Sequence, residues 1–522
     1  MANPAGSLDD SFVSIQDAQD PTTVTIKSEG GQTTTTTSTT TSHVRVIGSS
    51  RSTSSFSTTS SLHSSSAYNE KNDPSSPLYE DPRIPRRFEL QNRRPDLIPT
   101  LKHRLAEARY PDQIEAAGWS YGTETNMLKH LTREWLHHYD WEKELGKLNE
   151  EHEHWTCRVN GLDIHYVRHD PWAPPAVDEE TGEVIHGEQS GFAGHQTVND
   201  RGEIIIPLLL IHGWPGSWYE FGKALQLLKK RGRFQIIVPS LPGFGWSQAP
   251  TQKKFGVRAM AKILHDLMQQ LGYRYYVAQG GDWGGIISRA IATFYPENCL
   301  AIHVNMLPCL PPRPWSSPFQ FVKAITGFLA PSVVYKNNPR EQASINSLKL
   351  YAVEEGAYFF IQATKPQTLG HALLDSPVGL LSWLGEKYLS WADLDPAHVE
   401  SWPFTKTELL TQIMIYHSTE SITSSTRIYY ETYHNHDLQW LLRRPVPASV
   451  PVGVGVWNKE LFMVPRAWAN DWMNVVSWHE FPKGGHFAAF ERPAEYEKEI
   501  VGFFTSETVL DLFTAKRFGY KI

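Results

Sequence analysis

The sequence predicts an α/β fold with a mostly parallel sheet, and three features support this prediction. Apolar runs of strand length alternate with segments of helical periodicity through the middle of the chain. One run ends in Gly280-Gly281-Asp282-Trp283-Gly284, where small residues allow a tight turn from strand to helix. A long helical and aromatic stretch, 311–445, interrupts the alternation before strand-like runs return. Such alternation is typical of βαβ units in a sheet covered by helices on both faces.

The first 80 residues differ in composition from the rest of the chain. They are rich in Ser and Thr, with an unbroken run of threonine at 33–37. Because such a segment has too little apolar surface to offset the entropy lost on ordering, we expect 1–80 to be a disordered tail. The tail lacks the apolar core of a signal peptide, and the chain has no apolar run of 18 or more residues. We therefore expect a soluble, cytoplasmic protein without an integral membrane segment.

Composition narrows the class of partner. The formal net charge is -7 and no basic stripe stands out, which argues against a nucleic-acid partner. The chain has three cysteines, Cys157, Cys299 and Cys309. Their number is odd and their spacing is not that of metal ligands, so we expect a reducing compartment and no metal site. A homodimer is compatible with the sequence, which does not determine the oligomeric state.

The elements can be placed in chain order. Leu97, Leu101 and Leu105 recur at helical spacing, and Asn160-Gly161 separates two strand-like runs as in a hairpin. In the core, we expect strands at 208–211, 234–239, 275–278, 452–456 and 475–480, and helices at 218–230 and 258–271. The resulting organisation is a tail at 1–80, a helical domain with the hairpin at 81–168, a first core part at 169–310 with a polar insertion at 170–202, a helical lid at 311–445 and a second core part at 446–522.

Asp282 occupies the centre of the predicted turn. Gly280 and Gly284 lie two residues before and two after it, as in the nucleophile elbow of the α/β-hydrolase fold. Ligands of parallel sheets bind at the carboxyl ends of the strands, where Asp282 falls. The sequence therefore predicts an α/β-hydrolase fold with an aspartate as nucleophile.

Three further positions complete a candidate site. The loop His212-Gly213-Trp214-Pro215-Gly216 follows a buried strand, so the backbone N–H groups of Trp214 and Trp283 are the predicted oxyanion hole. His486 lies on a loop after the last predicted strand and is the predicted base. In this fold, the third catalytic residue is an acid that lies between the nucleophile and the histidine in the sequence. We choose Glu460; Asp471 and Glu480 also satisfy this chain order.

An aspartate nucleophile restricts the chemistry. Its carboxylate displaces a leaving group at carbon and forms an alkyl ester, which a histidine-activated water then hydrolyses. Epoxides and haloalkanes fit this reaction, whereas ordinary esters and amides do not. An epoxide oxygen needs a proton donor, which Tyr358, Tyr429 or Tyr430 of the helical stretch could supply.

Taken together, these motifs resemble those of the microsomal-type epoxide hydrolases, including soluble fungal members. The resemblance runs from about residue 86 to the carboxyl end and includes 212–216, 280–284 and 484–490, with 361–366 and 375–380 in the predicted lid. It implies Asp282 as nucleophile, Glu460 as charge partner and His486 as base, with Tyr358 and Tyr429 donating to the epoxide oxygen. It also implies that Tyr358, Tyr429 and Trp283 contact the substrate, and that no cofactor takes part.

The resemblance implies a function in xenobiotic detoxification and leaves alternatives. The expected partners are a small apolar epoxide and water. A haloalkane dehalogenase or an epoxide-opening cyclase would use the same residues. A non-catalytic binding protein should carry damage at one of these positions, and the sequence shows none. The Ser/Thr tail replaces the apolar anchor of membrane-held members, and the 170–202 insertion is longer than expected.

Overall fold

The computed structural model describes residues 25–27, 33–35, 81–169 and 197–518, and the chain divides into two units, 1–76 and 77–522. In the first unit, β1 (Thr25–Lys27) pairs antiparallel with β2 (Thr33–Thr35). The sequence analysis did not foresee these strands, whose β-branched Thr and Ile favour extended backbone. The rest of the predicted tail and most of the predicted insertion, 170–196, lie outside the described residues.

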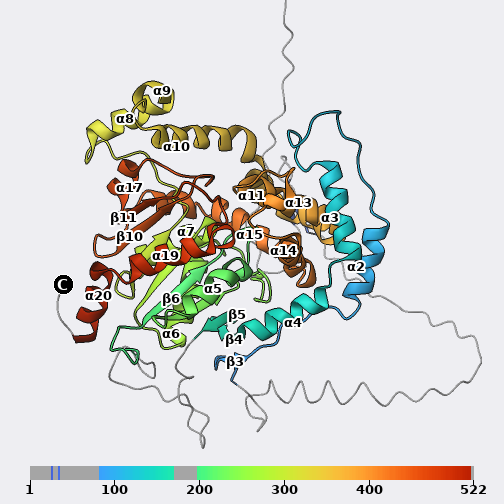
Figure 1. Ribbon diagram of the computed structural model, residues 1–522, viewed down its shortest axis with the longest axis horizontal. Helices are drawn as coiled ribbons and strands as arrows, with labels where there is room; N and C mark the ends of the chain where they lie inside the picture. Colours follow the sequence, from blue (N-terminus) through green and yellow to red (C-terminus); the bar gives the residue numbers. More distant parts are fainter. Residues whose placement is uncertain (1–24, 28–32, 36–80, 170–196, 519–522) are drawn as a thin grey trace, which may run out of the picture. The chain divides into compact units, whose positions relative to one another are not determined.

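The second unit is built on a nine-stranded mixed sheet. Its strands lie in the order β11, β10, β9, β8, β6, β7, β5, β4, β3 (Figure 1). Strands from β7 to β11 pair in parallel, and those from β7 through β5 and β4 to β3 pair antiparallel. The bounds are β3 (Arg86–Arg87), β4 (Glu153–Val159), β5 (Leu162–His169), β6 (Ile206–Ile211), β7 (Phe234–Pro239), β8 (Tyr276–Gly280), β9 (Cys299–Val304), β10 (Pro451–Val456) and β11 (Asn474–Glu480).

Helices cover both faces of the central strands, as the alternation predicted. The α5 and α19 helices pack together on one face, and α6 and α7 pack together on the other (Figure 1). Because β6 to β10 are buried on both sides, their sequences are apolar runs rather than alternating patterns. These helices are α5 (Gly222–Lys229), α6 (Val257–Gln270), α7 (Asp282–Phe294) and α19 (Pro493–Phe504), joined by η1 (Trp218–Phe221), α17 (Arg466–Trp472), α18 (Ala488–Glu491) and α20 (Glu507–Phe518).

The predicted hairpin is confirmed at the antiparallel end of the sheet. Asn160 and Gly161 both have positive φ, of 48° and 85°, as a tight turn between β4 and β5 requires. Before it come α2 (Leu97–Ala106), α3 (Thr125–His137) and α4 (Trp141–Glu151), whose buried apolar stripes face α13 and α14.

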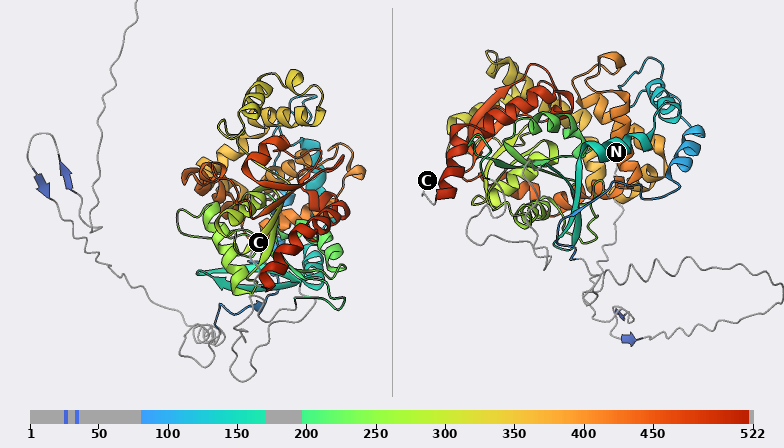
Figure 2. Two further views of the ribbon diagram at one scale, coloured as in Figure 1. Left: turned by 90° about the vertical axis from the view of Figure 1, so that its left-hand side faces the viewer. Right: turned by 60° about the horizontal axis from the view of Figure 1, so that its bottom comes forward.

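Helices fill the chain between β9 and β10, as predicted. Five of them begin with proline, which fits a first helical turn because its N–H would have no partner there. In the left view of Figure 2, α8 to α10 (yellow) stand above the sheet. The bounds are α8 (Pro318–Leu329), α9 (Pro331–Val334), α10 (Pro339–Leu350), η2 (Tyr351–Glu355), α11 (Ala357–Thr364), α12 (Pro366–Asp375), α13 (Pro377–Trp391), η3 (Val399–Ser401), α14 (Lys406–Ser418), α15 (Ile422–His434) and α16 (Asp437–Leu442).

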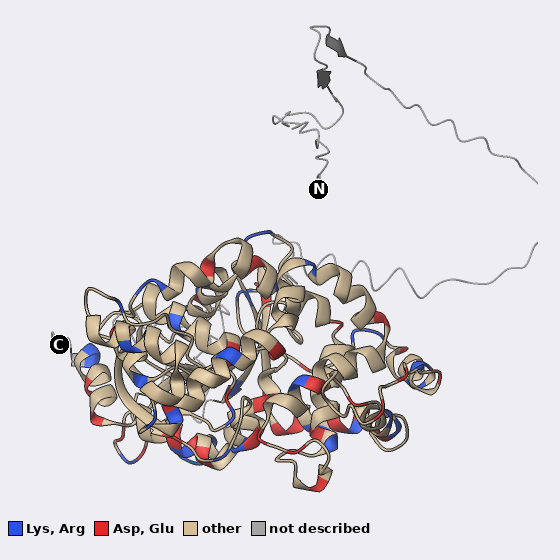
Figure 3. Ribbon diagram, turned by 90° about the horizontal axis from the view of Figure 1, so that it is seen from above, with Lys and Arg blue, Asp and Glu red and all other residues tan. Residues whose placement is uncertain are grey.

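The surface of the second unit mixes charges of both signs. Lys and Arg positions are interspersed with Asp and Glu along its ribbon (Figure 3). Within the described ranges, none of the helices has both the length and the apolar character needed to cross a bilayer.

Candidate active site

Asp282 lies at the turn between β8 and α7, where the sequence predicted it. Its φ is 48°, a left-handed conformation that costs energy for a residue with a side chain. The turn is also crowded: a Cβ on Gly284 would lie 1.9 Å from the Ile211 carbonyl oxygen, and one on Gly280 would lie 2.2 Å from the Gly284 carbonyl carbon. The two flanking glycines are therefore required by close backbone approach, as the pattern predicted.

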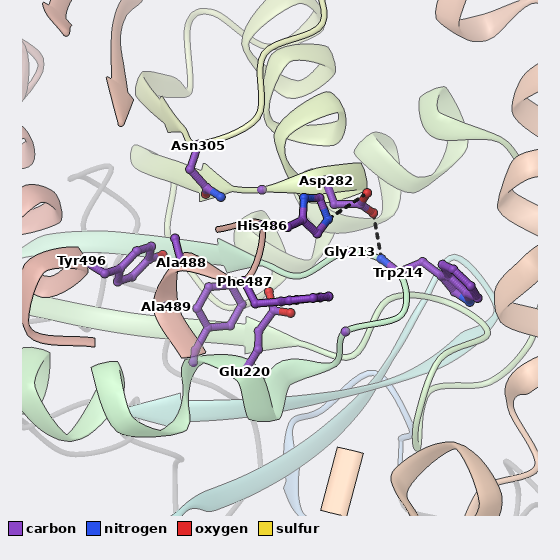
Figure 4. A pocket seen from close by; sticks show the side chains of 13 residues that line it. Gly213, Trp214, Glu220, Asp282, Asn305, His486, Phe487, Ala488, Ala489 and Tyr496 are labelled. Atoms are coloured by element: carbon purple, nitrogen blue, oxygen red, sulfur yellow. Dashed lines mark hydrogen bonds and ion pairs between the residues drawn. The ribbon is translucent and has the colours of Figure 1, made fainter. Parts of the chain in front are cut away.

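The loop after β6 supplies a hydrogen-bond donor to Asp282. The parallel register pairs Ile211 with Gly280, so both strands end side by side. The Trp214 N–H then donates to Asp282 Oδ1 at 2.8 Å (Figure 4). Gly213 allows this approach, because a Cβ there would lie 2.3 Å from Asp282 Oδ1.

Trp283 is placed differently from Trp214. Its indole ring is buried and lines an apolar pocket beside Asp282. Its backbone N–H donates no hydrogen bond within the described part of the chain. The second oxyanion-hole donor thus stays a prediction.

His486 lies between two carboxylates. Its Nδ1 is 2.7 Å from Glu460 Oε1. Its Nε2 is 3.5 Å from Asp282 Oδ2, as Figure 4 shows. The loops that carry Glu460 and His486 are joined by a parallel bridge between Lys459 and Gly485. Burial alone would lower the pKa of His486, but Glu460 and Asp282 together raise this pKa well above its ordinary value.

The two rival acids lie elsewhere. Asp471 forms an ion pair with Arg313 at 2.9 Å, and Glu480 lies on β11 within 3.9 Å of Arg340. Glu460 is buried and also accepts a hydrogen bond from the Leu461 N–H at 2.8 Å. Among the three acids, Glu460 contacts the histidine.

One residue that supports this site was not foreseen. Glu491, buried on α18, accepts backbone hydrogen bonds from Gly485, Phe487 and Asp393 at 2.8–3.0 Å. Burial raises the pKa of Glu491 to about 7, although these N–H groups oppose the shift. This carboxyl group fixes the loop on both sides of His486. The only sequence signal is an acid inside an apolar stretch five residues after His486.

The helical segment encloses an apolar pocket of about 270 Å³ over Asp282. Tyr358 and Tyr429 both line it, and their rings lie 5.9 Å apart in an edge-on arrangement. The Tyr358 hydroxyl lies 3.3 Å from that of Tyr351, and the buried Tyr429 hydroxyl interacts with the side chains of Trp283 and Tyr358. Burial raises the pKa of Tyr358 and of Tyr429 well above the ordinary value.

Tyr430, the alternative donor, faces away from this pocket. Its side chain is 37% exposed and contacts His434, whereas Tyr429 is 1% exposed. Consecutive helical residues point about 100° apart, so only one of the two can face Asp282. The structure places Tyr358 and Tyr429 around one pocket with Asp282 and leaves Tyr430 outside it. His486 lies beside Asp282, and Glu460 lies beside His486.

Comparison with known proteins identifies the family of this chain. The family model described as "Epoxide hydrolase N terminus" matches 85–221, and the one described as "alpha/beta hydrolase fold" matches 206–357. Epoxide hydrolase 1 of Oryctolagus cuniculus is 33% identical over 78% of this chain and 86% of its own length.

Two solved structures are similar to this chain along most of its length. The juvenile hormone epoxide hydrolase of Bombyx mori has a TM-score of 0.68 and 31% identity, over 83% of this chain and 96% of that one. The Aspergillus niger epoxide hydrolase has a TM-score of 0.64 and 28% identity, over 80% and 96%. The chain therefore belongs to the epoxide hydrolase family, on the α/β-hydrolase fold.

Proposed function

We propose that this enzyme converts an epoxide to a vicinal diol through a covalent ester of Asp282. One observation carries the proposal: the Asp282 carboxylate faces the apolar pocket with its two tyrosines and also lies 3.5 Å from His486 Nε2. A single carboxylate in this place can attack a bound epoxide and then be attacked by activated water.

In the first half-reaction, Asp282 attacks an epoxide carbon from the side opposite the oxygen. A carbon–oxygen bond to the carboxylate forms while the ring carbon–oxygen bond breaks, and the electron pair moves to the epoxide oxygen. Tyr358 and Tyr429 donate hydrogen bonds to that oxygen and one of them gives it a proton. Their raised pKa values keep both phenols protonated at neutral pH.

In the second half-reaction, His486 takes a proton from water, and the water oxygen bonds to the Asp282 carboxyl carbon. The Trp214 N–H already lies at Asp282 Oδ1 and would stabilise the negative charge that develops there, together with the N–H of Trp283. Ester formation removes one of the two anions beside His486. Its pKa should then fall, so that the first half-reaction prepares the base for the second.

The pocket suggests the class of substrate. Aromatic and aliphatic side chains dominate its lining, and Asp282 contributes the one carboxylate among the lining residues that the structure describes. A volume of about 270 Å³ suits a small apolar epoxide.

The proposal is tested by single-turnover hydration of styrene oxide in oxygen-18 water. Label should enter Asp282, detected by mass spectrometry of its peptide, while the diol of the first turnover stays unlabelled. Labelled diol with unlabelled Asp282 would mean that water attacks the epoxide directly. Halide release from haloalkanes without diol formation would favour the dehalogenase, and a cyclic ether product would favour the cyclase.

Tyr429→Phe is expected to lower kcat by about 10- to 100-fold, because the epoxide oxygen loses one of its two donors. The ester should form more slowly and be hydrolysed at the parent rate. Tyr430→Phe is the matched control, since the neighbouring Tyr430 lies outside the pocket and should retain full turnover. Stopped-flow measurement of ester formation distinguishes the two variants, and equal loss in both would contradict the assignment.

Two further predictions concern the cellular location and the oligomeric state. Cys157, Cys299 and Cys309 are buried and unpaired, which supports the proposed reducing, cytoplasmic location. A homodimer stays a prediction.

A further inference from the structure

A second, smaller cavity adjoins the catalytic carboxylate. It has a volume of about 20 Å³, enough for one water molecule. Most of its lining residues are buried, and Glu220, Gly281 and Asp282 are half-buried. Asp282 is the single residue that lines both this cavity and the apolar pocket. His486 and Glu220 also line the small cavity (Figure 4). We call it the water cavity.

Glu220 has no evident structural partner there. It lies in η1, and within the described chain its carboxyl group accepts no hydrogen bond and forms no ion pair. Nearby hydroxyls are already committed: Tyr388 donates to the Pro215 carbonyl at 3.1 Å, and Tyr416 donates to the Gly216 carbonyl at 2.7 Å. Tyr496, which also lines the water cavity, donates to Gln279. A carboxyl group that lines a water-sized cavity and has no protein partner there is satisfied by water.

The water that hydrolyses the ester must lie close to His486 Nε2 and to the Asp282 carboxyl carbon. The apolar pocket offers it little polar contact and holds the alkyl group of the ester at that stage. The water cavity reaches Asp282 and His486 together, and Glu220 and Asn305 also line it; Glu220 is the one further carboxylate among its described lining residues. A water there would have three polar partners, the number typical of buried waters.

We propose that Glu220 holds the hydrolytic water in the water cavity, which makes it a further site residue of the reaction. This inference rests on the proposed function. The water donates one O–H to Glu220 and the other to His486 Nε2. Its oxygen bonds to the Asp282 carboxyl carbon as the second proton moves to His486. That proton passes to the diol oxygen when the ester carbon–oxygen bond breaks. The other proton of the water stays on the Asp282 carboxyl group and returns to the tyrosine that protonated the epoxide oxygen, so Glu220 neither gains nor loses a proton.

The charge of Glu220 should modulate this step. Burial raises the pKa of Glu220 to about 8; the positive charge of His486 opposes the shift, and the negative charge of Asp282 adds to it. An ionised acceptor holds water more strongly than a neutral one, so ester hydrolysis should rise as Glu220 loses its proton. The titratable groups that face Glu220 are Asp282 at the start of α7, His486 after β11, Tyr388 on α13, Tyr416 on α14 and Tyr496 on α19.

Glu220→Gln tests the inference, because glutamine has nearly the same shape and cannot ionise. Stopped-flow tryptophan fluorescence with styrene oxide separates ester formation from ester hydrolysis. We expect hydrolysis to slow about tenfold while ester formation stays within twofold of the parent. Because the ester then accumulates, kcat and KM should fall together. The pH profile of hydrolysis should lose the ionisation due to Glu220 and keep that of His486.

Two further variants make the result specific. In Gly216→Ala, the new Cβ would lie 2.0 Å from Glu220 Oε2 and displace the carboxyl group, so hydrolysis should slow again. Glu497→Gln is the control, because Glu497 is a buried acid of α19 that pairs with Arg231 and lines neither cavity. The rates of ester formation and of ester hydrolysis should both match the parent.

Two outcomes would overturn the role of Glu220 alone. The first is ester hydrolysis at the parent rate and with the parent pH profile in Glu220→Gln. The second is an equal slowing of both half-reactions, which would indicate a purely structural role. Absence of an Asp282 ester in the parent enzyme would instead overturn the proposed function, and this inference with it.

Discussion

Replacing Asp282 with alanine is expected to lower kcat/KM for epoxide hydration by at least about 10⁴-fold, because the nucleophile is lost. No other described residue that lines the apolar pocket carries a carboxylate. Water held by His486 could not take over, since the alanine side chain offers no ester to attack. The measurement is diol formation from styrene oxide, together with intact-protein mass, which should show no adduct.

The stability of the Asp282→Ala variant should be measured as a control. Asp282 adopts a φ of 48°, where alanine is less tolerated than aspartate, so a small loss of about 1 kcal/mol is expected from the backbone. A folded Asp282→Ala protein that still hydrates epoxides at a tenth of the parent rate would mean that another residue is the nucleophile.

Local rules explain which parts of this site could be predicted. The turn around Asp282 requires small residues at fixed offsets, and Gly280 and Gly284 meet that requirement within five residues of sequence. Parallel strands buried on both faces give apolar runs, which located β6, β7, β8 and β10. The sequence analysis did not place β9 (Cys299–Val304), whose run is broken by His303; that side chain is buried beside Glu499.

Other parts depend on contacts that no local pattern records. Chain order allowed three acids as the partner of His486, and the bridge between Lys459 and Gly485 selects Glu460. Tyr429 and Tyr430 are equivalent in sequence, and the rotation of α15 decides which one is buried.

The supporting acids were harder still to foresee. Glu220 and Glu491 are ordinary glutamates in sequence. Only the folded structure shows that Glu220 lines the water cavity and that Glu491 fixes the histidine loop.

His486→Gln is expected to separate the two half-reactions. Glutamine cannot take a proton from water, so ester hydrolysis should slow by at least about 10³-fold. Ester formation needs an ionised Asp282 and the tyrosine donors, and both remain. The enzyme should therefore form one ester per molecule and then stop. Intact-protein mass should rise by the mass of one epoxide, and digestion should place the adduct on the peptide that contains Asp282.

The matched control is His417→Gln. His417 lies on α14 outside the pocket, where burial lowers its pKa to about 4, so it is neutral at the pH of the assay. Its replacement removes a partly buried imidazole without changing the charge near Asp282, and turnover should continue. In His486→Gln, by contrast, the positive charge held between Glu460 and Asp282 is lost. The Asp282 carboxylate then lacks a cation beside it, so its attack on the epoxide should persist while the ester it forms stays trapped. Turnover without a trapped ester in His486→Gln would mean that a different base activates the water.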